Sequence, residues 1–562
     1  MFIRVKNKPT QANVFNKTVQ LVESYREQGK VKQRIIKHLG VAYDQKQLDD
    51  LRSLAQILKE KLEDTPQFTL FNADDLPIIE EQNEGLSPHI EKEEDFNVDL
   101  RALEEQGRIV NGIHDIYGEL FDELNLKTIF KSPLRNKNAV NIFKQIVMAR
   151  IANPDSKRAS VRGLEEQFGV SLNLDQVYRM MDKVDDQVIE NLNQVAYRET
   201  KRLFNDKIDV IFFDATTLYF ESFREDEFKK NGYSKDLKFN QPQVVLALMV
   251  TKEGLPIGYQ AFSGDTFDGH TLMPALEQLK SQYNLDKVVY VADSGMFNEA
   301  NLSQLEAKNF DYIVGARIKN LPKALKEKIL DSSHYQPLNH SIKVARFKHK
   351  NRILVVTYSE KRAKKDRFER DKGIAKLKKK VEKHQSPKDY LSNQGYKKFL
   401  QLDKQCDAKI ILNEEKINEA SQWDGLKGLI VSQNSQLSDD EILTQYNNLW
   451  QVEQSFRITK HDLKIRPIYH WKPSRVKAHL AISFAAYMLA RYLEHRVKTQ
   501  YKKLSPAVLR NILLSVQTSV LDHPQKKIKY GLPSSITTDA IKIYQLMGVK
   551  MKRCAYIIEK YE

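Results

Sequence analysis

The sequence contains few of the residues that cross-link or anchor a chain. Only two of its 562 residues are cysteines, Cys406 and Cys554, and they lie far apart and form no CxxC pair. A disulfide framework or a cysteine-based zinc site is therefore not expected. Apolar runs are short as well: none reaches the roughly 18 residues that a membrane-spanning helix needs, and the first residues, MFIRVKNKPTQ, lack the apolar core of a secretory signal. We expect no membrane partner and a location in a reducing cytoplasm.

Acidic residues are too few to balance the basic ones. The chain has 90 lysine and arginine residues against 74 aspartate and glutamate residues, which gives a net charge of +16 and a pI of about 9.3. A surplus of this size favours an anionic partner, most often nucleic acid, and a basic surface kept for solubility is the alternative. Residues 64–99 hold eleven acidic residues and a single lysine, so the rest of the chain is more basic than the total suggests.

The first 205 residues divide into three parts. Residues 1–63 contain two alternating segments around a glycine turn and then a helical pattern, which predicts a hairpin followed by a helix. The acidic stretch 64–99 is predicted to be a linker, or else an acidic arm that covers a basic surface. Residues 100–205 have apolar residues every three or four positions, which predicts a helical region that we assign to DNA binding. Within it, SKRASVRGLEEQFGVSLNLDQVYRMMDKV fits a helix-turn-helix or a plain bundle about equally.

Residues 206–320 have a different pattern of apolar residues. Apolar runs such as KIDVIFFDAT, QPQVVLALMV, LPIGYQAFSG and DKVVYVADSG are mixed with helical segments, in the order strand, strand, strand, helix, strand, helix, strand. The first three strands are close enough to form an antiparallel meander, and the following helix crosses over to a parallel strand. This order resembles that of the ribonuclease H-like fold, in which the first and fourth strands are neighbours. We therefore predict an α/β multidomain protein whose core begins here.

After Arg317 the pattern breaks. Residues 321–432 mix short strands with a lysine-rich stretch and are predicted to be a β-rich insertion that interrupts the core. The lysine-rich stretch, residues 361–383, has twelve basic and four acidic residues, and it fits a phosphate-contacting surface or a solvated helix. Residues 433–500 return to helical spacing and are predicted to be the second part of the core. Residues 501–562 are predicted to be a C-terminal helical region.

Two aspartates, Asp214 and Asp293, each end an apolar strand of the predicted core. That is a costly place for an unpaired charge. Small residues follow each of them and leave room for a phosphate group. Either aspartate alone is more simply explained as a cap of the turn or helix that follows it. Because the predicted strand order places both at neighbouring strand ends, where open α/β sheets carry their chemistry, we favour a joint role as metal ligands.

A third carboxylate is expected on a helix that faces the two strand ends. The segment YNNLWQVEQSFRITKHDLK predicts an amphipathic helix in which Glu453, Arg457, Lys460 and Lys464 form a polar stripe. Glu453 and Arg457 also fit a simple i,i+4 ion pair on a solvated face. The stripe leads into a basic run that ends in RPIYHW, and a carboxylate beside several cations suits a site that holds both metal and phosphate.

Three clustered carboxylates suit phosphodiester cleavage. The charge of a phosphodiester repels nucleophiles, and two hard cations about 3.5–4 Å apart overcome this by activating the attacking hydroxyl and stabilising the leaving oxygen. Magnesium prefers oxygen ligands, above all carboxylates. Without cations the three carboxylates would repel one another. We therefore predict that Asp214, Asp293 and Glu453 are the catalytic residues and bind two Mg2+ ions, for which Mn2+ can substitute.

At this point the residues match a known family. The chain resembles the DDE transposases of bacterial insertion sequences, in particular the YREK-signature (IS-four) group. That signature is Tyr, two residues, Arg, three residues, Glu, six residues, Lys. Tyr446, Glu453 and Lys460 fall at the required spacing, whereas Leu449 stands at the Arg position. FFDAT, VADSGM and a large insertion before the glutamate are further landmarks, and the resemblance covers most of the chain.

The resemblance implies an activity as well as a fold. Such enzymes bind the inverted repeats at the ends of their own element, cut the DNA through attack by water, and join the freed 3′-hydroxyl ends to target DNA. Their partners are double-stranded DNA, as element ends and as target, and a second copy of the chain, since they act as homodimers on DNA. Mg2+ is their usual cofactor. The Tyr446 and Lys460 positions are associated with contacts to the DNA backbone in this family. Apart from the resemblance, Arg457 lies one turn after Glu453 and could supply the cation that Leu449 lacks.

Other residues are weaker candidates for DNA contacts. Trp423 lies late in the insertion, where it could stack on a displaced base, although a lone tryptophan is more often part of a core. Lys235 and Lys238 lie in a loop just before the second core strand, which could meet DNA or be plain surface. His270 is more simply a helix-start residue. The basic residues of the first hairpin fit a contact with the element end or plain surface.

Two rival hypotheses remain open. A ribonuclease H-like nuclease without strand transfer would carry the same carboxylates, but it would not need the large N-terminal region or the Tyr446 and Lys460 spacing. A transposase-derived DNA-binding protein without catalysis is favoured by Leu449 alone, since all three acidic positions are filled.

Overall fold

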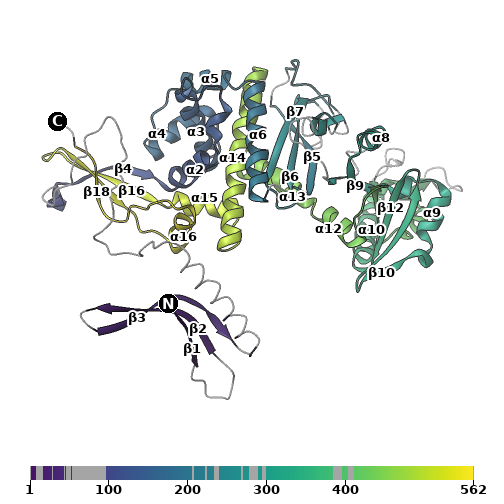
Figure 1. Ribbon diagram of the computed structural model, residues 1–562. Helices are drawn as coiled ribbons and strands as arrows, with labels where there is room; N and C mark the ends of the chain where they lie inside the picture. Colours follow the sequence, from purple (N-terminus) through teal and green to yellow (C-terminus); the bar gives the residue numbers. More distant parts are fainter. Residues whose placement is uncertain are drawn as a thin grey trace. The chain divides into compact units, whose positions relative to one another are not determined.

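The computed structural model of the protein forms two compact units, Met1–Glu91 and Lys92–Glu562, each of which is described by itself (Figure 1). The structure describes residues 2–7, 17–27, 30–42, 45, 48, 52, 96–205, 208–221, 224–232, 240–266, 270–271, 273–277, 289–293, 299–383, 395–402 and 410–560. Most of the predicted acidic linker, and most of the helix predicted before it, lie outside these residues.

The first unit contains a three-stranded antiparallel sheet of β1 (Phe2–Asn7), β2 (Lys17–Glu27) and β3 (Lys30–Ala42), in that order. The predicted hairpin is confirmed, because β2 and β3 pair along their lengths. The strand β1 was not predicted, since its residues alternate over only one short segment. Val19, Leu21 and Val22 are buried on β2.

The second unit is built on a nine-stranded mixed sheet. Its order is β10-β11-β12-β15-β9-β8-β5-β6-β7. The predicted core is confirmed in order and direction: β5 (Val210–Tyr219), β6 (Gln243–Thr251) and β7 (Pro256–Ser263) form an antiparallel meander, and β8 (Val289–Ala292) and β9 (Asp311–Ala316) lie parallel to β5. The helix α8 (Glu299–Ala307) connects the last two strands. Every residue of β6 is buried, as expected for a strand covered on both faces.

The strands of the predicted insertion are not a separate module. β10 (Gln336–Asn339), β11 (Ile342–His349), β12 (Arg352–Ser359) and β15 (Leu426–Ser432) continue the same sheet. β15 pairs antiparallel with β9 and thereby satisfies the backbone groups that would be open if β9 were an edge strand. The insertion also contains α9 (Lys323–Leu330), α10 (Glu360–Lys383), β13 (Leu400–Leu402), β14 (Ile410–Leu412) and α11 (Glu414–Ser421).

Helices pack around α14 (Pro473–Gln500), a 28-residue helix that is buried along most of its length. It contacts α2 (Gly112–Glu123), α3 (Lys137–Ala152), α5 (Leu174–Asp182), α6 (Asp186–Leu203) and the strand β7, while α4 (Lys157–Phe168) packs on α3 and α5. In Figure 1, α14 lies between the helices α2–α5 and the strands β5–β7. Alanines such as Ala481, Ala485 and Ala486 let neighbouring elements approach it closely on several sides.

The C-terminal region is not only helical, which corrects the prediction for residues 501–562. It contains α15 (Pro506–Leu514) and α16 (Thr538–Met547), but also β16 (Gln517–His523), β17 (Ile528–Pro533) and β18 (Tyr556–Lys560). These strands form a four-stranded sheet with β4 (Glu104–Val110), in the order β18-β17-β16-β4. The pairing joins strands more than 400 residues apart, so neither segment reveals it alone.

The helix predicted over residues 446–464 is broken. α12 (Asp439–Asn447) ends at a turn, α13 (Trp450–Arg457) follows, and the chain then passes into a π-helical turn, η8 (Ile458–Asp462). Asn447 and Asn448 stand at the break, where asparagine side chains compete with helical hydrogen bonding. Short 3-10 turns lie at Leu100–Ala102, Leu126–Ile129, Ile318–Asn320, Ser332–His334 and Gly395–Phe399. Among the described residues, the structure has no helix with the length and apolarity needed to cross a membrane.

Candidate active site

The sheet places Asp214 and Asp293 side by side. β5 and β8 pair in parallel with Phe212 opposite Val291, and each aspartate follows two residues later. Continuing that register brings the two residues to the same level on strands that are about 4.8 Å apart. Side chains two residues apart share a face of a sheet, so Asp214 lies on the face of Phe212 and Asp293 on that of Val291. Both apolar residues belong to the large core that also contains Val452 and Phe456 of α13.

Asp214 is half-buried in a strand whose other residues are nearly all buried. Its carboxylate accepts a hydrogen bond from the backbone N–H of Ala215, with 2.8 Å between N and Oδ1. Asp293 follows the last residue of β8 and is exposed. The two carboxylates are thus presented at the end of β8 and the middle of β5, with β5 continuing past the site.

Tyr446 of α12 contacts Asp293 directly. Its hydroxyl donates to Asp293 Oδ1 at 3.2 Å. Burial raises the pKa of Tyr446, and the charge of Asp293 and this hydrogen bond raise it further, so the hydroxyl remains a protonated donor. The charge of Glu453 is a smaller contribution in the same direction, which places Glu453 in the same electrostatic environment. Lys427 of β15 lies over the Tyr446 ring, with Nζ 4.3 Å from the ring centre.

Glu453 lies in the first turn of α13 and is exposed. It lines a cavity of about 710 Å3 together with Trp450, Arg457, Lys498 and Lys503, among others. Within the described part of the chain, no hydrogen bond or ion pair engages its carboxylate. Arg457 is therefore not the i,i+4 partner that the sequence allowed, and both side chains are open to a ligand.

The structure does not bring the three carboxylates together as one metal-binding group. Over the residues that it describes, no set of three or more His, Cys, Asp and Glu side chains is close enough to hold a metal ion. Residues 294–298, which follow Asp293, lie outside the description. Asp214 and Asp293 are placed by the sheet register, and Glu453 lies on the helix that covers the same face. The donor set consists of carboxylate oxygens, which suit a hard divalent cation.

Leu449, at the position of the signature arginine, is only 8% exposed and packs into the large core. An arginine there would have to bury its charge or leave the core. Arg457 is exposed one turn after Glu453. In this chain a core residue therefore occupies the position of the signature arginine, and the nearest cation on the helix is Arg457.

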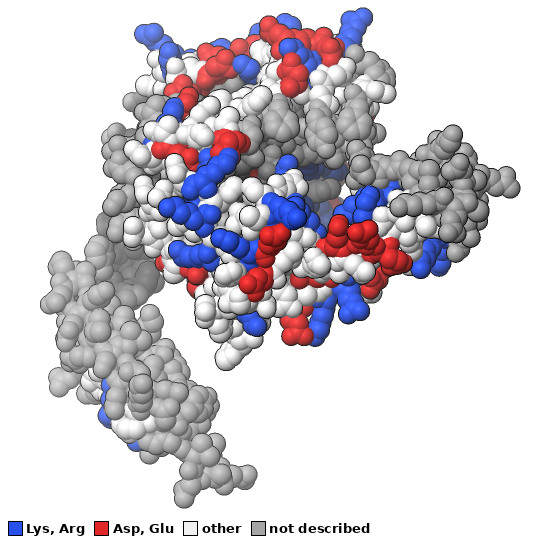
Figure 2. All heavy atoms as spheres, turned by 90° about the vertical axis from the view of Figure 1, so that its right-hand side faces the viewer, with Lys and Arg blue, Asp and Glu red and all other residues white. Residues whose placement is uncertain are grey.

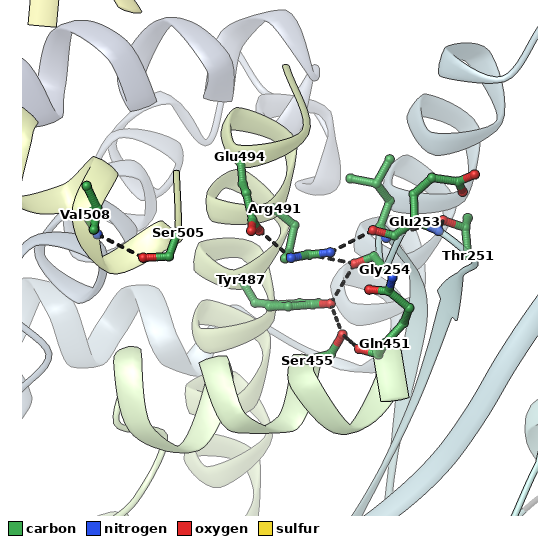
Figure 3. A network of polar contacts seen from close by, with 11 residues as sticks. Thr251, Glu253, Gly254, Gln451, Ser455, Tyr487, Arg491, Glu494, Ser505 and Val508 are labelled. Carbon is green, nitrogen blue, oxygen red and sulfur yellow. Dashed lines mark hydrogen bonds and ion pairs between the residues drawn. The ribbon is translucent and has the colours of Figure 1, made fainter. Parts of the chain in front are cut away.

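A buried polar network links α13 to α14 and to the turn between β6 and β7 (Figure 3). The Tyr487 hydroxyl lies 2.6 Å from Ser455 Oγ and donates to the Gly254 carbonyl at 3.0 Å. Arg491 donates to the carbonyls of Gly254 and Glu253 at 2.9 and 2.7 Å and pairs with Glu494. The network joins the turn between β6 and β7 to α14 and to the helix that carries Glu453.

The remaining predicted residues fall into different settings. Lys460 is half-buried in η8 and Lys464 is exposed. Trp423 is partly buried against the hydrophobic cluster of β11 and β12, which favours its core role. Lys235 and Lys238 lie outside the described residues, and His270 is helical and exposed. The lysine-rich helix α10 is largely exposed and carries i,i+4 ion pairs such as Arg362–Asp366 and Lys365–Glu369, as a solvated helix does.

Several residues of the site were not predicted. Lys427 is a single lysine in an apolar strand, and nothing in the sequence places it over Tyr446. Arg491 and Tyr487 lie within a long helical pattern that gives no sign of their contact with Gly254. Figure 2 shows one face of the molecule, on which clusters of basic side chains (blue) lie between acidic ones (red). The positive charge is thus distributed in patches on this face.

Two family models match parts of the chain. The family model described as "Transposase DDE domain" matches residues 205–489, just over half of the chain. A second model, "IS1634 family transposase, N-terminal domain", matches residues 3–68. Similar solved structures include the piggyBac transposase synaptic complex with hairpin DNA (12% identity, TM-score 0.37, 72% of this chain and 76% of that one). They also include the Mos1 transposase paired-end complex with left transposon end (13% identity, TM-score 0.14, 28% of this chain and 53% of that one). No curated protein sequence matches the chain.

The chain belongs to the DDE transposase family, since the DDE-domain model spans half of it. Together with the match at its N-terminus, this makes the protein an insertion-sequence transposase. It is an enzyme of a family that uses divalent metal ions.

Proposed function

We propose that the protein binds the inverted repeats of its own insertion sequence, cleaves the DNA there and joins the freed 3′-hydroxyl ends to target DNA. Residues 206–320 and 433–500 form the two parts of a ribonuclease H-like catalytic core, and the helical region 100–205 contributes to DNA binding. The position of Tyr446, Glu453 and Lys460 supports membership of the YREK-signature group, with Leu449 as its exception. The protein acts as a homodimer that holds two element ends.

One observation carries the proposal. Asp214 and Asp293 each lie two residues beyond the paired residues Phe212 and Val291 of neighbouring parallel strands, α13 packs against β5, and Tyr446 donates to Asp293. Asp214 and Asp293 of the sheet, together with Glu453 of α13, would hold two Mg2+ ions, which would activate the attacking hydroxyl and stabilise the leaving oxygen when bound. The Tyr446 hydroxyl fixes the orientation of the Asp293 carboxylate.

The basic candidates and Trp423 are proposed to contact DNA. Arg457 at the end of α13, Lys460 in the π-helical turn η8 and Lys464 just after it would offer cations to the phosphate backbone beside the reacting bond. Trp423, Lys235 and Lys238 are proposed as weaker DNA contacts. Water attacks the phosphorus first and the bond to the 3′-oxygen breaks, which leaves a 3′-hydroxyl and a 5′-phosphate. The freed 3′-hydroxyl then attacks a phosphodiester of the target, whose own bond between phosphorus and the 3′-oxygen breaks and releases a 3′-hydroxyl of the target strand.

The test is cleavage of a labelled duplex that carries the repeat bordering the gene, with Mg2+, by the wild type and by Asp293→Ala. We expect the wild type to cut at the repeat boundary, and the variant to bind the duplex but to cut roughly a thousandfold more slowly or not at all, since the metal supplies several kcal/mol. The matched control is Asp311→Ala, which removes a partly buried aspartate at the start of the neighbouring strand β9.

The same assay separates the rival hypotheses. Binding without cutting by the wild type, in Mg2+ and in Mn2+, would replace the catalytic proposal with the DNA-binding one. Cutting without transfer of the labelled end into a supercoiled plasmid would favour a nuclease.

A further inference from the structure

The segment that follows η8, residues 462–472, exposes two aromatic side chains. Tyr469 is 63% exposed and Trp471 is 67% exposed, while Ile465 and Ile468 of the same segment are buried. Large aromatic rings are usually withdrawn from water, and their exposure close together commonly marks an interaction surface. The buried isoleucines anchor the segment, so the aromatic rings are turned outward by its own packing.

The backbone of this aromatic segment, residues 462–472, is held in place by side chains from elsewhere in the fold. Five of its carbonyl oxygens accept hydrogen bonds from cationic or imidazole groups. These bonds are Arg510 to Asp462 (3.0 Å), Arg150 to Leu463 and Lys464 (3.4 and 3.1 Å), His479 to Ile465 (3.0 Å) and Lys229 to Trp471 (3.2 Å). A surface fixed in this way loses little conformational entropy when it binds a partner.

The segment carries exposed cations beside its aromatic rings. Lys464 and Lys472 are exposed on the segment itself. Arg150, Lys157 and His479 lie beneath it at 2–3% exposure, and burial lowers the pKa of Lys157 and of His479 well below the usual range, which disfavours their charged forms. Exposed aromatic rings next to exposed lysines fit a nucleic acid strand, because the rings stack on bases while the lysines neutralise phosphates.

The aromatic segment contacts the far end of the strand that carries Asp214. Arg466 places its guanidinium 4.5 Å from the ring centre of Tyr219, the last residue of β5, the strand that carries Asp214. In the sequence the segment begins two residues after Lys460, at the end of the π-helical turn that follows α13. DNA that crosses this surface therefore passes the end of the strand that carries the first aspartate.

We propose that Tyr469 and Trp471 stack on unpaired nucleobases of the DNA strand beside the cleavage point. The inference rests on the proposed function, since it assumes that DNA is bound at Asp214 and Asp293. It adds the chemical form of the DNA at this surface: bases that are out of the duplex, read through their flat faces and not by sequence.

Tryptophan fluorescence tests the contact directly. The chain has three tryptophans, so the double variant Trp423→Phe, Trp450→Phe leaves Trp471 as the single reporter. The probes are an oligothymidine of about 20 nucleotides, long enough for several base contacts, and a blunt duplex of equal length. We expect strong quenching by oligothymidine and weak quenching by the duplex. Equal quenching by both, or none with oligothymidine bound, overturns the proposal.

Affinity measurements separate stacking from charge. Trp471→Ala and Tyr469→Ala should each weaken oligothymidine binding roughly tenfold, while Trp471→Phe retains most of the affinity. The matched control is Phe368→Ala, because Phe368 of α10 is 64% exposed and has Lys372 over its ring, but lies on a solvated helix. A loss with Phe368→Ala equal to that with Trp471→Ala would show that any exposed aromatic ring suffices. Thermal unfolding checks that the variants fold.

Cleavage of the repeat duplex then distinguishes the two proposals. A wild type that cuts, together with an unquenched Trp471, retains the transposase and rejects the stacking surface. A quenched Trp471 in a protein that cuts no DNA retains the surface and rejects the catalytic proposal.

Discussion

The two halves of the candidate site are held by different means. Asp214 and Asp293 lie on β5 and β8, where backbone hydrogen bonds of the sheet fix the level of each residue. Glu453 lies on α13, a helix of eight residues between a turn and a π-helical segment. Its placement depends on Tyr487 and Arg491 of α14, whose side chains donate hydrogen bonds to the carbonyl of Gly254 (Figure 3). The strand half is therefore set locally, whereas the helix half is set by contacts over more than 200 residues of sequence.

The largest effect is expected from breaking the helix half at Gly254. This residue has φ +78°, and a Cβ there would lie 2.3 Å from Arg491 Nη2. Gly254→Ala should lower the free energy of unfolding by about 2–4 kcal/mol, from left-handed backbone strain and a displaced buried arginine. Urea unfolding and cleavage of the repeat duplex measure the two consequences.

Cleavage by the folded fraction of Gly254→Ala should fall more than DNA binding does, because α13 loses its support. Lys252→Ala is the control: its side chain lies on the same turn and is about half exposed, so its stability should change by no more than about 0.5 kcal/mol. Unchanged cleavage per folded molecule of Gly254→Ala would limit the network to a role in folding.

A smaller effect is expected from restoring the signature arginine. Leu449→Arg places a charge at a position that is 8% exposed in the core between α12 and α13. We expect a loss of about 1–3 kcal/mol in unfolding free energy and no gain in cleavage, because the cation cannot reach DNA from there. Leu449→Met, which keeps the volume and the apolar character, should cost less than about 1.5 kcal/mol. Faster cleavage by Leu449→Arg would contradict the assignment of this position to packing.

The smallest effect concerns the link between the two halves. Tyr446→Phe removes the hydrogen bond to Asp293 and keeps the ring under Lys427. A typical hydrogen bond contributes about 1 kcal/mol, so cleavage should slow roughly fivefold to tenfold while the unfolding free energy changes little. Tyr501→Phe, which removes a hydroxyl bonded to Asp539 on the C-terminal region, is the matched control. Equal rates for wild type and Tyr446→Phe would show that the sheet alone orients Asp293.

The contrast between local and long-range contacts also explains which features of the site can be predicted from the sequence. The strands that carry Asp214 and Asp293 were recognisable because apolar runs ending in aspartate are local patterns, and connection rules then fix their order. The break at Asn448 and the burial of Leu449 depend on how α12 and α13 pack, which helical periodicity does not contain. The sheet of β4 with β16 joins ends of the chain that share no pattern. Lys427 was missed for the same reason, because its partner Tyr446 lies on another element.

The sheet extension has a consequence for how this enzyme can be altered. β12 and β15 pair up to Tyr358 and Leu426, so the chain leaves the sheet for α10 and returns at adjacent points. Residues 359–425 are therefore inserted between two strands that are paired as in a hairpin. A short turn in their place is expected to keep β15, Lys427 and the pairing with β9, whereas removal of β15 would leave β9, the neighbour of β8, as an edge strand. The natural boundary for exchanging parts between such enzymes is therefore the base of this hairpin.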